Sequence, residues 1–243
     1  MEGLNPNVHA DTPWKEKLEF DIATRGVREL NQLLHHDLSR TGVRRVEVLN
    51  PDGVHSIAVG VDAPIDIEIW GHAGYYAAGM NRQARVIIHG NAGTGVAENM
   101  MSGTVRVEGC ASASAGASGH GGTLIIDGDA SVRCGISMKG IDIVVGGSVG
   151  NYSAFMAQAG TLLVCGDAGH ALGDSLYEAV IYVRGKIGSL GADAQEEPMT
   201  DTDYANVSEL LRRTGYRHSP RQFKRVGSAR KLYHWNADAN QEY

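Results

Sequence analysis

Hydrophobic and polar positions alternate along short stretches of this chain, and each stretch closes on a glycine. In the segment VIIHGNAGTG, residues 86–95, the aliphatic run ends at Gly90. The same pattern recurs in seven consecutive units of 19 residues, with no insertion or deletion. The corner glycines of these units are Gly71, Gly90, Gly109, Gly128, Gly147, Gly166 and Gly185. A fixed period of this kind is the signature of a repeat architecture.

Two columns of the repeat are aliphatic throughout. The residues two positions before the corner glycine run from Ile69 to Val183, and those four positions before it run from Ile67 to Ile181. This alternation predicts a strand with one buried face in every unit. Identical registers stack at strand spacing, about 4.8 Å. The sequence therefore predicts an all-β protein, a single-stranded parallel β-helix of about seven coils.

The glycines of residues 86–95 have a second interpretation. A strand followed by glycines also begins some phosphate-binding loops, because backbone N–H groups there can approach an anion. Such a loop occurs once and opens a helix, whereas the pattern at Gly90 occurs in seven units and leads to another strand each time. We therefore favour corners, where glycine allows a positive φ or a close backbone approach.

The two ends of the chain depart from the repeat, and a solenoid needs caps over its terminal coils. We expect an N-terminal cap over residues 1–60, the parallel β-helix over 61–191 and a C-terminal tail over 192–243. The cap should hold a helix that begins at Thr24 as N-cap. Strands should follow over 43–49 and 55–60, together forming an imperfect extra coil.

The C-terminal tail shifts from acidic to basic. After the acidic stretch 193–209 we expect a short helix with an apolar face made of Val207, Leu210 and Leu211. Between residues 212 and 231 stand eight Lys or Arg residues and no acid. Three interpretations of this basic run are open. It is solvated, it binds the chain's own acidic segment, or it binds a partner subunit. We favour the partner subunit, with Lys224 and Arg225 as candidate contacts, over nucleic acid.

Composition narrows the class of protein. Of the 243 residues, 42% are hydrophobic and only 6% aromatic, so the core must be aliphatic. The net charge of −6 argues against nucleic acid as the main partner. The first residues of the sequence do not resemble a signal peptide, and we expect no membrane span because no window reaches 18 apolar residues. Three cysteines favour a reducing cytoplasm.

Residues with catalytic potential are scattered over the registers. The cysteines do not share a column and are expected to be small buried hydrophobes: Cys110, Cys134 and Cys165. The histidines outside the cap also occupy separate registers, and they include His72, His89, His120 and His170. The carboxylates next to corners are best explained as polar corner residues: Asp127, Asp129 and Asp167. We therefore predict no catalytic, cofactor-binding or metal-ligating residue in this chain.

One outward-facing column is unexpectedly apolar. Three positions before the corner, consecutive coils carry Ile125, Val144, Leu163 and Tyr182. A bare apolar stripe on the outside of a solenoid is unfavourable. Either the terminal segments of the chain cover the stripe or another subunit does, and we favour another subunit.

The repeated G-x-x-G motif resembles a known domain. It stands at Gly90–Gly93–Gly95, Gly147–Gly150 and Gly166–Gly169, and the resemblance to the C-terminal glycine-repeat domain of the glutamate synthase large subunit covers about residues 21–191. The ending RQFKRVGSARKLYHW, residues 221–235, resembles a narrower group in which this domain is a separate protein, the middle subunit of N-methylglutamate synthase complexes.

The resemblance implies a right-handed β-helix and a non-catalytic scaffold role. The scaffold would hold a glutaminase-like class II amidotransferase subunit and an FMN-dependent synthase subunit together. FMN and an iron–sulfur cluster would belong to the synthase subunit and no cofactor to this chain. Two alternatives stay open: a β-helix similar to the subunit of formylmethanofuran dehydrogenase that shares this glycine repeat, and a stand-alone β-helix enzyme with its own groove of acids and bases.

Overall fold

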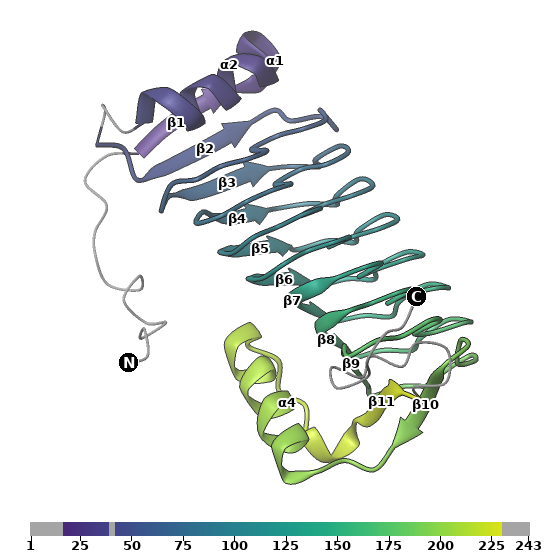
Figure 1. Ribbon diagram of the computed structural model, residues 1–243. Helices are drawn as coiled ribbons and strands as arrows, with labels where there is room; N and C mark the ends of the chain where they lie inside the picture. Colours follow the sequence, from purple (N-terminus) through teal and green to yellow (C-terminus); the bar gives the residue numbers. More distant parts are fainter. Residues whose placement is uncertain (1–16, 39–41, 230–243) are drawn as a thin grey trace, which may run out of the picture.

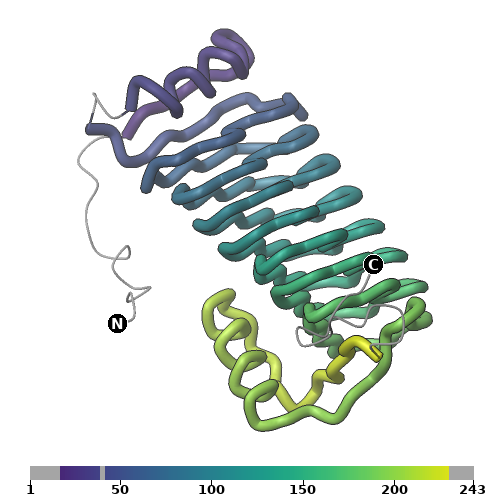
Figure 2. Tube along the Cα trace, in the orientation of Figure 1, coloured from purple at the N-terminus to yellow at the C-terminus, as the bar shows by residue number. Residues whose placement is uncertain are grey.

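The structure is a computed structural model that describes residues 17–38 and 42–229. One side of the solenoid is a sheet of parallel strands stacked in chain order (Figures 1 and 2). These strands are β1 (Lys17–Asp21), β2 (Arg45–Leu49), β3 (Asp66–Trp70), β4 (Arg85–Ile88), β5 (Thr104–Val107), β6 (Thr123–Ile126), β7 (Lys139–Val145), β8 (Ala159–Val164) and β9 (Val180–Val183). The predicted parallel β-solenoid is confirmed.

The register between coils is the predicted one. Val86 of β4 pairs with Ile67 of β3 and Val105 of β5, so residues 19 apart lie side by side. All side chains of the two aliphatic columns are fully buried in one continuous core. Burial of each such side chain contributes about 1.5–3 kcal/mol. The small residues after the corners also stack, as bridges such as Ala73–Ala92 show.

The corner glycines serve close approach more than unusual dihedrals. Of the seven, only Gly71 has a positive φ, +142°. A Cβ at Gly90 would lie 2.7 Å from the carbonyl oxygen of Gly71, and one at Gly128 would lie 2.8 Å from that of Gly109. After Gly90, the N–H groups of Ala92, Gly93 and Gly95 donate to neighbouring coils. They are therefore not free to cradle a phosphate, and the corner interpretation is confirmed.

The side of the solenoid opposite the strands has an unusual backbone. After each of the first six corners, the residues five, seven and nine positions later have positive φ, such as Tyr76 (60°), Ala78 (54°) and Met80 (54°). A left-handed conformation costs a non-glycine residue roughly 1–2 kcal/mol. Hydrogen bonds between coils offset this cost: Tyr76 N–H donates to Thr94 and Ala78 N–H donates to Ile57.

The N-terminal end corrects two expectations. The first helix, α1 (Ile22–Arg25), begins before Thr24, because Asp21 is the N-cap and its carboxylate accepts from Ala23 N–H. It is followed by α2 (Val27–Gln32) and the π-helical turn η2 (Leu33–Asp37). The predicted strand over 43–49 is present as β2. The predicted strand over 55–60 is absent, because these residues form turns in which the backbone adopts the left-handed conformation, as it does in other coils. The imperfect extra coil is confirmed, since β2 pairs with β3.

The C-terminal segment folds back along the outside of the sheet. β10 (Ala194–Glu197) leads into α4 (Asp201–Thr214), and a 3-10 turn, η3 (Pro220–Gln222), precedes β11 (Lys224–Ser228). β11 is antiparallel to both β9 and β10, so it closes the last coil. In Figure 1, α4 stands beside the lower coils. None of the helices in the described ranges is long and apolar enough to span a bilayer.

Candidate interaction surfaces

The outer face of the sheet is divided into two halves of opposite character. On β6–β9 the column three positions before the corner is the predicted apolar stripe, Ile125, Val144, Leu163 and Tyr182. Helix α4 covers this half: Val144, Leu163 and Tyr182 pack with its apolar face, made of Val207, Leu210 and Leu211. The two alternatives were that a terminal segment of the chain covers the stripe or that another subunit does. In the structure a terminal segment of the chain, α4, covers it.

Polar contacts fix α4 at its beginning. The Tyr182 hydroxyl donates to Asp203 Oδ1 at 2.6 Å. Burial of this hydroxyl and its hydrogen bond to the carboxylate raise the pKa of Tyr182. Thr200 and Asp203 form a reciprocal capping box. Burial opposes ionisation of Asp203, but the hydrogen bonds from Thr200 and Tyr182 outweigh it and lower the pKa of this carboxyl.

Polar side-chain contacts also join the C-terminal end of α4 to the sheet. Arg213 contacts Thr123 and Asp142 on the sheet. Beyond the helix, the Tyr216 hydroxyl donates to Asp127 Oδ1 at 2.6 Å, and Arg106 binds the same carboxylate through two hydrogen bonds of 2.8 Å. Asp127 therefore marks the border between the covered half of the face and the open half.

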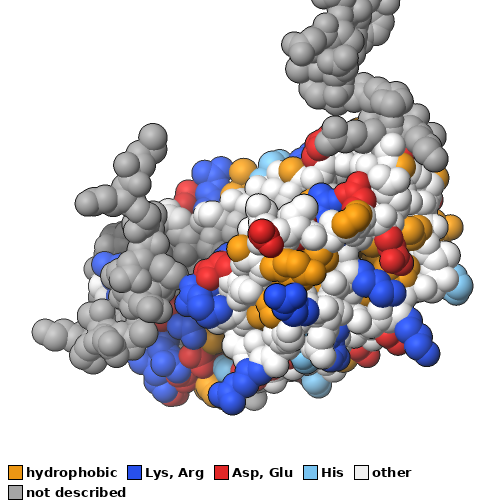
Figure 3. Space-filling view, turned by 90° about the horizontal axis from the view of Figure 1, so that it is seen from below, with side chains coloured by type: hydrophobic (Ala, Val, Ile, Leu, Met, Phe, Trp, Pro, Cys, Tyr) orange, Lys and Arg blue, Asp and Glu red, His pale blue; other side chains and the backbone are white. Residues whose placement is uncertain are grey.

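The two basic residues predicted to contact a partner, Lys224 and Arg225, have different surroundings. Arg225 is paired within the chain, with Glu197 and with Asp203. Lys224 is exposed on β11. Seen from the C-terminal end, the surface shows hydrophobic side chains in small groups between acidic and basic ones (Figure 3). Arg225 thus acts on the chain's own acidic segment, which was one of the alternatives for the basic run, and only Lys224 is open to a partner.

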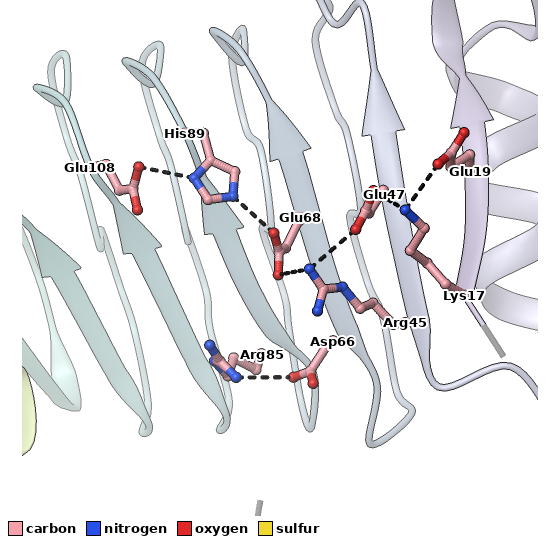
Figure 4. Close-up of polar contacts among 9 residues, drawn as sticks. All are labelled: Lys17, Glu19, Arg45, Glu47, Asp66, Glu68, Arg85, His89 and Glu108. Carbon is pink, nitrogen blue, oxygen red and sulfur yellow. Dashed lines mark hydrogen bonds and ion pairs between the residues drawn. The ribbon is translucent and has the colours of Figure 1, made fainter. Parts of the chain in front are cut away.

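The half of the face on β1–β5, which we call the open half because α4 does not cover it among the described residues, carries a chain of alternating charges (Figure 4). We call it the charge ladder, and its members in spatial order are Glu108, His89, Glu68, Arg45, Glu47, Lys17 and Glu19. Arg45 lies 2.8 Å from Glu68 and 3.1 Å from Glu47, and Lys17 Nζ lies 2.9 Å from Glu47. The hydrogen bond from Lys17 lowers the pKa of the Glu47 carboxyl.

His89 occupies the central position between two carboxylates. Its Nδ1 lies 2.9 Å from Glu108 and its Nε2 lies 3.0 Å from Glu68. The ring also stacks on the indole of Trp70, with 3.9 Å between centroids. Partial burial lowers the pKa of His89, but the hydrogen bonds to Glu108 and Glu68 outweigh burial, so the pKa is raised. The imidazolium form is therefore favoured.

The residues directly after the corners form a second, structural ladder. Each side chain accepts the backbone N–H of the equivalent residue one coil later: His72 accepts from Asn91, and Asp129 accepts from Ser148 at 2.7 Å. Cys110 is also part of this ladder, since its Sγ accepts from Asp129 N–H. Asp167 accepts from Lys186. Asp129 and Asp167 therefore satisfy the backbone at the corners, as the sequence suggested, whereas Asp127 binds Arg106 and Tyr216 instead.

The cysteines fall into two classes. Cys134 and Cys165 are buried, as expected, and burial raises the pKa of their thiols to about 12 and about 11. The expectation of burial was wrong for Cys110, which is exposed. His120 and His170 are both exposed. Within the described residues no group of three His, Cys, Asp or Glu side chains is arranged to hold a metal ion.

Sequence reasoning did not identify the charge ladder, although part of its signal was present. Glu68, His89 and Glu108 come from adjacent coils, in the columns one and three positions before the corner. Residues about 19 apart are spatial neighbours, so opposite charges there predict ion pairs. Arg45 and Glu47 could not be placed in this way, because 21 residues separate Arg45 from its partner Asp66.

A curated protein matches this chain along almost its whole length. No family model matches the chain. A curated protein, Protein GlxC from Rhizobium meliloti (strain 1021), is 53% identical over 225 residues. The match covers 92% of this chain and 99% of that protein. At this identity over nearly the whole of both chains, the chain belongs to the same family as Protein GlxC.

Proposed function

We propose that this chain is the non-catalytic scaffold subunit of a glutamate-synthase-like flavoenzyme complex of the N-methylglutamate synthase type, in the cytoplasm. Its partners would be a glutaminase-like class II amidotransferase subunit and an FMN-dependent synthase subunit. The complex would convert methylamine and glutamate to N-methylglutamate and ammonia. FMN and an iron–sulfur cluster would be held by the synthase subunit.

The observation that carries this proposal is the unbroken stack of coils with the G-x-x-G motif at its corners. Each coil is bonded to the next along the strands and again at the corners, by bonds such as Gly109 N–H to Gly90 O at 3.0 Å. Such a stack is stiff, and a stiff body can fix the distance between two active sites on separate subunits. The relation to Protein GlxC, which extends over 92% of the chain, also supports the proposal.

The test is purification of the tagged full chain from its own cells, followed by native mass measurement and an absorbance scan. We expect two larger proteins to co-purify in fixed ratio, with a flavin spectrum. A colourless chain that is alone or self-associated would overturn the proposal. Co-purification with molybdenum or tungsten in place of flavin would transfer the chain to a formyl dehydrogenase complex.

A further inference from the structure

We infer that the open half of the sheet's outer face is the docking surface for a cationic segment of a partner protein, with Trp70 and Glu108 as its principal contacts. This inference rests on the proposed function, because it requires a complex. It concerns β1–β5, where the charge ladder lies, and not the apolar half under α4 (Figures 1 and 4). The partner is defined by its chemistry, a segment that presents arginine or lysine side chains.

The first argument is that the surface is rigid before a partner arrives. Both ring nitrogens of His89 lie within 3.0 Å of carboxylate oxygens. Donation by both nitrogens, the imidazolium form, would satisfy both carboxylate contacts at once. Glu68 is further fixed by Arg45 at 2.8 Å. Side chains that are already ordered lose little entropy on binding, which favours affinity.

The second argument is the position of Trp70. Among the exposed large hydrophobic residues of the described chain, Trp70 alone lies on a strand of the sheet. Its indole is held against the His89 ring and yet 46% of the residue is exposed. An ordered tryptophan with free ring surface is typical of the residues that dominate binding energy at interfaces. Its ring also attracts cations, and arginine most readily stacks on it.

The third argument is charge. The nine residues drawn in Figure 4 comprise five carboxylates, three Lys or Arg residues and His89, so this set has one carboxylate in excess even with His89 protonated. The excess is accessible at Glu108, whose side chain is 48% exposed and whose Oε2 is the atom that contacts His89. Electrostatic complementarity therefore favours a cationic partner at this place.

The experiment uses four variants of the tagged full chain, expressed in its own cells, with native mass measurement of the isolated complex. Trp70→Ala and Glu108→Arg change the proposed surface. Tyr152→Ala and Glu209→Arg are matched controls, since Tyr152 is 47% exposed and the Glu209 side chain 50%. Thermal unfolding of each purified chain checks that the fold is retained.

We expect Trp70→Ala and Glu108→Arg to weaken retention of one larger subunit by at least about 30-fold, the effect typical of a central interface residue. Both controls should retain it. In rebinding of the purified partner, Glu108→Gln should reduce the salt dependence of affinity, whereas Trp70→Ala should leave it unchanged.

The outcomes separate the two proposals. If the wild-type chain co-purifies with both subunits and all four variants do the same, the docking surface is refuted and the scaffold role stands. If no other subunit co-purifies with the wild-type chain, the scaffold role is refuted whatever the variants show. A self-association that Trp70→Ala abolishes would assign the surface to a second copy of this chain and overturn the cationic partner.

Discussion

The covering of the apolar stripe by α4 can be tested with one charge placed at two positions of the same column. Leu163 and Ile87 both lie three residues before a corner, on the outer face of the sheet. Leu163 is fully buried under α4, whereas Ile87 lies on the open half and is only partly buried. Lysine at either position leaves the inner core untouched, so the difference between the two variants isolates the contribution of α4.

The expected magnitude follows from burial. Loss of the Leu163 side chain alone should cost about 2–5 kcal/mol. Burial of an unpaired ammonium group would add several kcal/mol, unless α4 moves away. A domain of this kind has roughly 5–15 kcal/mol of stability in total. Leu163→Lys should therefore release α4 or unfold the chain, while Ile87→Lys should change the stability by less than about 1 kcal/mol, because its ammonium reaches water.

The assay is limited proteolysis of residues 200–216 together with thermal unfolding of both variants. Val207→Asp, on the facing side of α4, provides an independent variant that should expose the same segment, since Val207 is fully buried. If Leu163→Lys and Val207→Asp keep the protease resistance and unfolding midpoint of Ile87→Lys, α4 does not cover the stripe. The stripe would then again require another subunit.

The solenoid could be predicted because its long-range contacts are periodic. From Ile67 to Val183, strand residues 19 apart pair with one another, apart from a register shift at Lys139, so reading a column down the sequence is equivalent to reading across the sheet. The same argument fails at residues 55–60. Their aliphatic composition is typical of a strand, yet the backbone alternates into the left-handed region at Ser56 and Ala58. Hydropathy reports burial and is insensitive to the sign of φ.

The cover of the stripe could not be predicted for a different reason. The sequence showed an apolar column ending at Tyr182 and an apolar helix face at Val207, but two such faces are compatible with many partners. What joins them are individual polar contacts, such as the one between Tyr182 in the last coil and Asp203, which lies outside the periodic part of the chain. Contacts of this kind can be recognised only once the fold of the tail is known. The tail has no sequence repeat from which its position against the sheet could be predicted.

The core, the cysteines and the charge ladder each lead to a further test. Ile126→Asp, which places an unpaired charge between coils, should abolish the cooperative unfolding transition, and a folded soluble variant would refute the register. A thiol reagent should modify Cys110 in the native protein and spare Cys134, whose burial raises its pKa to about 12; equal reaction of both would contradict the burial pattern. His89 should link stability to pH, because partial burial lowers its pKa by less than the hydrogen bonds to Glu108 and Glu68 raise it. A group whose pKa is raised on folding adds stability that is complete below its unfolded value, about 6.5, and is lost as the pH rises through the folded value. Urea denaturation should therefore show a larger stability gap between wild type and His89→Gln at about pH 6 than at about pH 8.5. A gap that widens as the pH rises would mean that His89 is neutral between its two carboxylates.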